Sequence, residues 1–237
     1  MAAQYFTSWS FSRWVDYCLC PLKAYLNHIQ KIREPENDAM ARGAQIHDLA
    51  SAYIKGTGRL PPELKLFKEE FAKLRKLFKR KLQPAIVEED WAFTKEWDQT
   101  RWDDWLGCWV RIKLDAAHYE AEETLIVTDW KTGKFREEDN ALYLAQLELY
   151  ALAALLLHPH LEAVKPRLCY LDLGDTYPKE PLVYSRQDIR KLQMTWAKRV
   201  KPMMSDRQFA PRPNDKCKWC WYGQSGKIKG GPGKCKF

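Results

Sequence analysis

The chain has 237 residues, of which 46% are hydrophobic and 13% aromatic, enough for one sizeable core or for a core with an appendage. No run approaches the roughly 20 apolar residues of a membrane span. Residues Met1 to Asp16 lack the basic segment and apolar stretch of a secretory signal. The composition therefore predicts a soluble, cytoplasmic protein without a membrane partner.

The net charge of +8 is concentrated near the C-terminal end. Between Lys201 and Phe237, nine lysines and arginines stand against two aspartates, so the rest of the chain is close to neutral. Trp219, Trp221 and Tyr222 are interleaved with these cations, a pattern that suits a polyanion with flat bases to stack on. A tail that only increases solubility is the alternative.

Seven cysteines in a chain without an export signal argue against a disulfide framework. Two form a C-x-x-C motif near the end, a third follows them, and two more lie near the start: Cys217 and Cys220, then Cys235, and Cys18 and Cys20. This placement favours a bound metal.

Helices are predicted in the first part of the chain. Residues 5 to 26 open with a Ser/Thr cluster that can cap a helix, and Pro21 should end that helix just after Cys20 or begin the next one. A second helix is expected over residues 43 to 55, with His47 in its first turns. A lone histidine there is more often an ordinary polar residue than a ligand.

A third helix, Leu64 to Leu82, is amphipathic, and its basic outer face is either simply solvated or touches a phosphate backbone. The pattern then shortens to three strands, predicted at Ile86–Thr94, Trp105–Asp115 and Leu125–Lys131. A polar turn at residues 120–123 separates the last two.

A helix over Asn140–Leu157 and a strand over Leu168–Leu173 follow, so the chain crosses over as in a βαβ unit. A short strand at Val183–Tyr184 and a helix over Ser185–Met204 complete the regular elements, because the chain after Pro211 is rich in Pro, Gly and Lys. This order predicts an α/β fold with a mixed central sheet.

The end of the third strand carries the candidate chemistry. Side chains alternate along a strand, so Asp129 and Lys131 share one face. If the polar turn centres near residue 122, Asp115 lies opposite Asp129, with Cβ atoms about 5 Å apart. A hard divalent cation such as Mg²⁺ would remove the repulsion between the two carboxylates. The alternative is a solvated strand end with a surface ion pair.

Four motifs occur in a set order: G-x-x-x-H at a helix start, an aspartate ending a strand, D-x-K before T-G on the next strand, and Q-x-x-x-Y on the following helix. They are carried by Gly43 with His47, by Asp115, by Asp129 to Gly133, and by Gln146 with Tyr150. With the run from Ser8 to Tyr25, they resemble the PD-(D/E)XK nuclease superfamily over roughly residues 8 to 235. The likeness is strongest to its RecB-like branch and to the iron-sulfur nucleases of CRISPR adaptation and related phage proteins. Ala116 and Trp130 depart from the usual glycine and tyrosine, and neither removes a ligand.

The resemblance implies one nuclease domain over residues 1–237, in a phage or prokaryotic host. A helical segment at residues 5–35 would carry the first cluster cysteine, a restriction-endonuclease-like core would span residues 40–204, and a basic cysteine-rich tail would span residues 205–237. The N- and C-terminal cysteine segments would be joined at a metal cluster.

The resemblance also implies roles for individual residues. Mg²⁺ or Mn²⁺ would be bound by His47, Asp115, Asp129 and the backbone carbonyl of Trp130. Lys131 would position the attacking water and stabilise the transition state. Gln146 and Tyr150 would shape the site or grip the strand, and Glu88 is a weaker candidate to support the ligands.

By the same resemblance, a [4Fe-4S] cluster would be held by Cys20, Cys217, Cys220 and Cys235, with Zn²⁺ as the alternative metal. The three other cysteines, Cys18, Cys108 and Cys169, are expected to be ordinary buried thiols.

The implied function is a Mg²⁺- or Mn²⁺-dependent deoxyribonuclease, an exonuclease that acts on single-stranded DNA ends, in DNA repair or recombination. The alternative is a non-catalytic DNA-binding subunit with a zinc site that assembles with a helicase or recombination partner.

Overall fold

The computed structural model describes residues 4–224 and 230–237, so Lys227 and Lys229 of the predicted basic tail lie outside the described residues. The chain divides into two compact units. Residues 37–196 form the larger one, and residues 1–36 together with residues 197–237 form the smaller one.

The larger unit is built on a mixed sheet flanked by helices, which confirms the predicted α/β class. Its strands are β2 (Ile86–Phe93), β3 (Val110–Ala121), β4 (Thr124–Lys131), β5 (Ala163–Tyr170), β6 (Asp175–Tyr177) and β7 (Tyr184–Ser185). The β2–β3 and β3–β4 pairs are antiparallel, β4 and β5 are parallel, and β6 and β7 both pair antiparallel with β5. No strand was predicted from the sequence at the position of β6.

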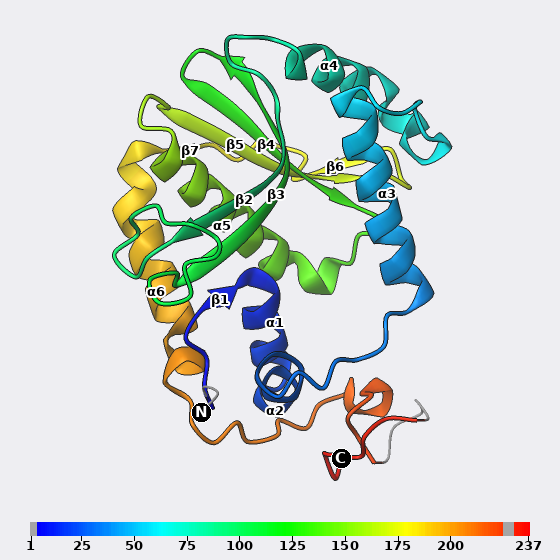
Figure 1. The fold of residues 1–237 in the computed structure, drawn as a ribbon, viewed down its shortest axis with the longest axis vertical. Helices are drawn as coiled ribbons and strands as arrows, with labels where there is room; N and C mark the ends of the chain where they lie inside the picture. Colours follow the sequence, from blue (N-terminus) through cyan, green and yellow to red (C-terminus); the bar gives the residue numbers. More distant parts are fainter. Residues whose placement is uncertain (1–3, 225–229) are drawn as a thin grey trace. The chain divides into compact units, whose positions relative to one another are not determined.

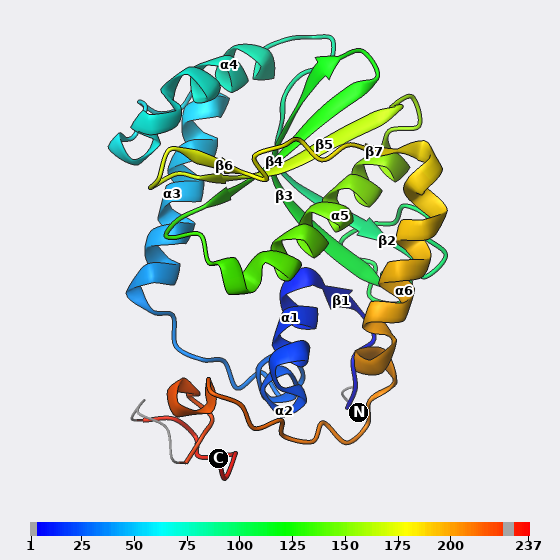
Figure 2. The same cartoon turned by 180° about the vertical axis from the view of Figure 1, so that it is seen from behind.

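Helices cover both faces of this sheet (Figure 1, Figure 2). On one face, α3 (Asp38–Lys55) and α4 (Lys68–Phe78) pack around Trp130, whose ring centroid lies 5.3 Å from that of Phe71. On the other face lies α5 (Asn140–Leu157), where Leu147 packs against Leu168. Because side chains alternate along β4, Trp130 points to the α3–α4 side of the sheet, and its neighbours Asp129 and Lys131 point to the α5 side.

The β3–β4 hairpin has the register that the alternating pattern predicts. Ala116 pairs with Thr128, so continuing the register by one residue sets Asp115 opposite Asp129. Only residues 122 and 123 separate the two strands. The predicted facing of the two carboxylates therefore follows from the turn position.

The strand predicted over Trp105–Asp115 begins later, at Val110, and continues to Ala121. Asp104 explains the late start, because its carboxylate accepts hydrogen bonds from the Thr100 hydroxyl (2.7 Å) and the Gly107 amide (2.8 Å). These bonds hold the residues before β3 in a compact loop.

The predicted βαβ crossover is present, because α5 connects the parallel strands β4 and β5. β5 begins at Ala163 rather than at the predicted Leu168, although it contains Pro166. Pro166 falls between the stretches of β5 that pair with β7 and with β6, where the strand pairs only with β4. Its missing N–H can therefore face an unpaired edge.

Two helix boundaries differ from prediction. α3 begins at Asp38 rather than Gly43, because the Asn37 side chain accepts a hydrogen bond from the Met40 amide (3.0 Å) and caps the helix. The helix predicted over Leu64–Leu82 is a 3₁₀ segment (Pro62–Phe67) followed by α4.

Residues Glu137–Leu157, which include α5, form the one helix in the described part of the chain that is long and apolar enough to cross a membrane by length and composition. This helix is an exception to the expectation that no run approaches the length of a membrane span. The window is 50% buried inside the molecule, and α5 packs against β3, β4 and β5. That packing is typical of a core helix.

The smaller unit starts with β1 (Trp9–Ser10) and the helices α1 (Phe11–Leu19) and α2 (Pro21–Ala24), followed by a π-helical turn (Tyr25–Ile29). Ser10 caps α1 through the Arg13 amide, and Pro21 opens α2, both as predicted. The α-helix α6 (Ile189–Ser205) begins in the larger unit, after a capping box formed by Ser185 and Asp188, and its residues from Ala197 onward belong to the smaller one.

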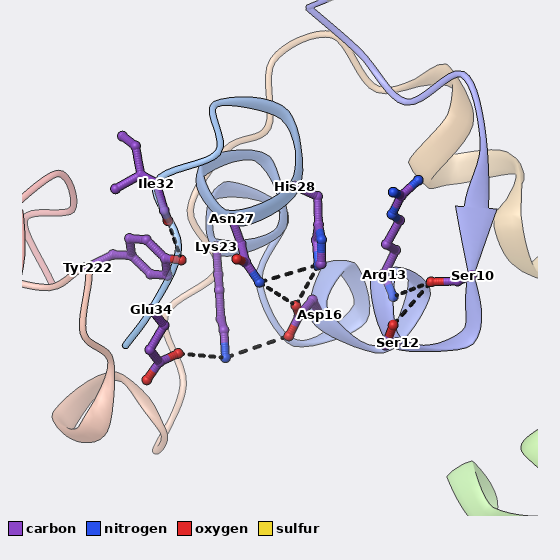
Figure 3. A network of polar contacts seen from close by, with 10 residues as sticks. All are labelled: Ser10, Ser12, Arg13, Asp16, Lys23, Asn27, His28, Ile32, Glu34 and Tyr222. Atoms are coloured by element: carbon purple, nitrogen blue, oxygen red, sulfur yellow. Dashed lines mark hydrogen bonds and ion pairs between the residues drawn. The ribbon is translucent and has the colours of Figure 1, made fainter. Parts of the chain in front are cut away.

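A polar network in the smaller unit centres on Asp16 (Figure 3). Its carboxylate lies 2.8 Å from His28 Nε2, accepts a bond from the Asn27 amide (3.3 Å) and lies 3.6 Å from Lys23 Nζ. Although burial raises the pKa of Asp16, these partners lower it overall. The network joins α1 to the turn after α2.

A histidine is buried on the α4 side of the sheet in the larger unit. His118 on β3 is 2% exposed, and its Nε2 accepts a hydrogen bond from Lys73 Nζ (3.0 Å). Burial, reinforced by the positive charges of Lys73 and Arg167, lowers the pKa of His118 to about 4. The imidazole is therefore neutral in the folded protein.

We predict that His118 makes the fold sensitive to mild acid. In the unfolded chain a histidine takes up its proton near pH ~6.5, whereas folded His118 does so only near pH 4. Between these values the unfolded state binds more protons, so stability falls as the pH is lowered. His118→Gln, which keeps an acceptor for Lys73, should lose less stability from pH 7 to pH 4 in thermal unfolding. His160→Gln, at an exposed position, is the control, and parallel pH profiles for wild type and His118→Gln would contradict the prediction.

Candidate active site

The last residues of β4 bring a carboxylate and an ammonium group together. Lys131 Nζ lies 2.7 Å from Asp129 Oδ2, and it also donates a hydrogen bond to Gln146 Oε1 (3.0 Å). Asp129 is buried, at 5% exposure. Although burial lowers the pKa of Lys131, the charge of Asp129 raises it overall, so the side chain is a fixed ammonium.

Helix α5 fixes the orientation of Asp129. The Tyr150 hydroxyl donates to Asp129 Oδ1 (2.7 Å), and Gln146 Nε2 donates to the same oxygen (3.1 Å). Gln146 and Tyr150 are four residues apart and lie on one helical face. The structure therefore brings the predicted Q-x-x-x-Y pair onto the D-x-K motif, with all four side chains in contact.

Helix α3 supplies His47 from the other face of the sheet. His47 Nδ1 lies 3.2 Å from Asp115 Oδ1, and His47 Nε2 lies 2.9 Å from the Trp130 carbonyl oxygen. Asp115 Oδ2 accepts a hydrogen bond from the Trp130 amide (2.7 Å). The residues predicted to bind a metal thus meet at one edge of the hairpin.

The electrostatics of this edge are those of crowded, buried acids. Burial, followed by the neighbouring charge of Asp129, raises the pKa of Asp115. Although burial lowers the pKa of His47, its contact with the Asp115 carboxylate raises it overall. Positive charge is therefore favoured next to Asp115.

Glu88 on β2 belongs to the same group. It lies opposite Asp115, because Val87 pairs with Ala116 and Glu89 with Leu114. One ligand atom from each of His47, Glu88 and Asp115 lies within 4.8 Å of the others, the only such group among the described residues. From the sequence, Glu88 was a weaker candidate than the others, because nothing in a row of acidic residues on a strand indicates which of them faces the site.

The donor set fits a divalent cation. Glu88 Oε1 is buried and has no hydrogen-bond partner among the described residues, so an acceptor remains unsatisfied beside Asp115. Carboxylate oxygens suit Mg²⁺ and Mn²⁺, and the imidazole of His47 suits Mn²⁺ better than Mg²⁺. The observed residues are therefore chemically suited to the predicted ion.

The chain leaving Lys131 is clamped in a way that the sequence did not indicate. Gly133, with φ of 100°, donates its amide to Asp172 Oδ2 (2.8 Å). Arg42 on α3 binds both oxygens of Asp172, at 2.9 and 2.7 Å. The T-G part of the motif therefore forms a turn that only a glycine adopts readily, tied to α3.

The four cysteines predicted to hold a cluster lie on segments that contact one another within the smaller unit. Cys20 Sγ accepts a hydrogen bond from the Arg212 amide (3.4 Å), and Cys217 Sγ accepts one from the Asn214 amide (3.3 Å). The Asn214 side chain donates to the Leu19 carbonyl (3.1 Å). Gly223, three residues after Cys220, forms an isolated β-bridge with Cys235. The Cys220 amide donates a hydrogen bond to the Cys217 carbonyl.

Two of the other cysteines are buried as expected, Cys108 and Cys169, but Cys18 is exposed, so that prediction was wrong. Trp14 and Tyr17 take the buried face of α1. Cys18 follows Tyr17 by one position, about 100° further around the helix.

A family model for the PD-(D/E)XK nuclease superfamily matches residues 8–225. Among solved structures, a crystal structure named "Putative exonuclease" from Eubacterium rectale is similar at 11% identity and a TM-score of 0.49, covering 95% of this chain and 90% of that chain. A crystal structure of SSO0001 is similar at 14% identity and a TM-score of 0.36, covering 93% and 85%. A search among curated proteins finds no match.

We predict that the Tyr150 hydroxyl stabilises the fold by ordering Asp129. Tyr150→Phe removes one donor to a buried carboxylate, which should lower the free energy of unfolding by about 2 kcal/mol in urea titrations. Tyr5→Phe, at a residue that is 40% exposed, is the control. Equal unfolding free energies for wild type and Tyr150→Phe would count against this role.

Proposed function

Because the chain belongs to the PD-(D/E)XK nuclease superfamily, whose model matches residues 8–225, we propose that it is a Mg²⁺- or Mn²⁺-dependent deoxyribonuclease. The observation that carries the proposal is the convergence of two helices on the β3–β4 hairpin. α3 brings His47, α5 brings Gln146 and Tyr150, and the hairpin itself brings Asp115 and the D-x-K pair.

In this proposal the ion is held by His47, Asp115, Asp129 and the Trp130 carbonyl; His47 contacts Asp115 and that carbonyl, and the hairpin register sets Asp129 opposite Asp115. When bound, a divalent cation would polarise a phosphate oxygen and lower the pKa of an attacking water. The protein supplies the geometry, since Trp130 and Asp115 are joined by a 2.7 Å hydrogen bond across the hairpin.

Lys131 is proposed to orient the water and to stabilise negative charge on the phosphoryl oxygens in the transition state. Its ammonium is fixed between Asp129 Oδ2 (2.7 Å) and Gln146 Oε1 (3.0 Å), so it needs little reorganisation. Tyr150 and Gln146 occupy Asp129 Oδ1, which leaves the other oxygen to Lys131 or to an ion. These two residues therefore act by positioning.

Single-stranded DNA is the proposed substrate. Beside the site, the ring of Phe135 lies 5.4 Å from that of Tyr143 and 5.0 Å from that of Tyr177, and it is 37% exposed. Lys134 and Arg136 flank it in sequence. An exposed ring flanked by cations suits unpaired bases and their phosphates. We propose that the enzyme acts at the ends of such single strands.

A [4Fe-4S] cluster is proposed in the smaller unit, held by Cys20, Cys217, Cys220 and Cys235. Support comes from the contacts that bring the segments of these cysteines together. Further support comes from Tyr222, near Cys220, whose hydroxyl donates a hydrogen bond to the Ile32 carbonyl (2.8 Å) and so ties the C-terminal segment to the N-terminal one (Figure 3). Such a cluster would close a loop of nearly the whole chain.

We predict Mn²⁺-dependent degradation of end-labelled single-stranded DNA. Asp129→Ala and Lys131→Ala should each lower the rate at least about 100-fold, because the first removes a carboxylate of the proposed metal site and the second removes the ammonium proposed to stabilise the transition state. Asp90→Ala, at an exposed position of β2, is the matched control. Circular single strands and blunt duplexes should be degraded more slowly.

Equal rates on circular and linear single strands would overturn action at ends. DNA binding without cleavage, unchanged by Asp129→Ala, would instead favour the non-catalytic assembly subunit.

We predict that protein purified without oxygen is brown, with broad absorbance in the blue region and bound iron and sulfide. Cys217→Ser should lose this absorbance, because a thiolate ligand is lost. Cys18→Ser should keep it, since Cys18 is exposed and outside the proposed set. A colourless protein with stoichiometric zinc would overturn iron-sulfur ligation.

A further inference from the structure

We propose that the loop between β2 and β3 is a stacking platform for the bases of single-stranded DNA, with Trp105 as its main surface. The proposal rests on the proposed function and adds to it a place where the strand is held away from the reacting phosphate. The aromatic residues of this loop lie outside the motifs around Asp129.

The loop, residues 94–109, leaves the sheet at the ends of β2 and β3 (Figure 1) and presents large apolar side chains to solvent. Leu106 is completely exposed, Trp105 is 80% exposed and Trp102 is 38% exposed. Single exposed apolar residues are ordinary, whereas a cluster of them in one loop marks a binding surface. The cluster therefore points to a ligand that covers it.

A cation on β3 fixes the two tryptophan rings. The Arg111 guanidinium lies 5.3 Å from the ring centroid of Trp105 and 5.8 Å from that of Trp102, and Arg111 Nε donates a hydrogen bond to the Trp102 carbonyl (3.0 Å). The backbone beside Trp105 is fixed too, because the Leu106 amide donates to Asp104 Oδ1 (3.2 Å). Rings that are already ordered lose little freedom when a ligand stacks on them.

The strand that carries Arg111 also connects the rings to the site. Side chains alternate along β3, so Arg111, Lys113 and Asp115 share one face of the sheet. Arg111 lies about 13 Å from Asp115 along the strand, at a rise of about 3.3 Å per residue. The side chain of Lys113, between them, is 69% exposed, so this face is open to solvent there. A strand whose phosphate lies at Asp115 therefore reaches the rings by passing Lys113.

Charge indicates which ligand suits the loop. The carboxylates next to the rings have partners of their own, since Asp103 accepts two hydrogen bonds from Arg101 (2.9 and 2.6 Å) and Asp104 accepts those of the loop backbone. A polyanion with flat groups fits better than an apolar ligand, because its bases stack on the rings while its phosphates lie near Arg111 and Lys113. Every base has a π face, so the platform holds a strand without selecting its sequence.

The test measures the binding of fluorescently labelled oligothymidylate by anisotropy in EDTA, which withholds the divalent ion. Trp105→Ala should weaken this binding about tenfold, because a stacking surface is lost, and Trp105→Phe should keep most of the affinity. An abasic strand of the same length has no rings to stack, so Trp105→Ala should bind it as tightly as the wild type does. Leu82→Ala, at a residue that is 81% exposed and precedes the opposite end of β2, is the matched control and should change neither affinity.

Equal affinities of the wild type and Trp105→Ala for oligothymidylate would overturn the proposal. An equal loss on the abasic strand would overturn it as well, because it would show a general defect instead of lost stacking. Self-association of the wild type that Trp105→Ala abolishes, with DNA binding unchanged, would make the loop an interface between copies of this chain instead. A protein that binds oligothymidylate through Trp105 but cleaves no DNA with Mn²⁺ would contradict the proposed function and leave this inference standing.

Discussion

The repulsion between two buried carboxylates, Asp115 and Asp129, is the constraint on which the site depends. The hairpin register sets them opposite each other, and burial removes the water that would separate their charges. The fold places the imidazole of His47 beside Asp115 and the ammonium of Lys131 beside Asp129. The two flanking helices are needed because one of them carries the imidazole and the other holds the lysine in place.

The site therefore has two halves with different partners. On the α5 side, Tyr150 and Gln146 donate hydrogen bonds to Asp129 Oδ1, and Lys131 Nζ forms an ion pair with Oδ2, which accepts no hydrogen bond among the described residues. On the α3 side, Glu88 retains an unsatisfied oxygen. One half is preorganised for water and phosphate, and the other is suited to an ion, a division of labour that a single strand end could not provide.

The sequence was most informative where a local pattern determines the structure. The ends of α5 and the facing of Asp115 and Asp129 follow from helical composition and from a turn position. Glu88 was predicted only as a weaker candidate, because a left-handed backbone leaves no trace in a run of acidic residues. The late start of β3 was also hidden, since side-chain bonds to Asp104, rather than strand alternation, decide it.

The Arg42–Asp172–Gly133 clamp has a mechanical consequence. Arg42 and His47 are little more than one turn apart on α3, so the helix that carries the imidazole also anchors the loop leaving Lys131. A shift of α3 would displace both at once. The salt bridge between Arg42 and Asp172 therefore links the position of α3, and with it the imidazole, to the loop that follows Lys131.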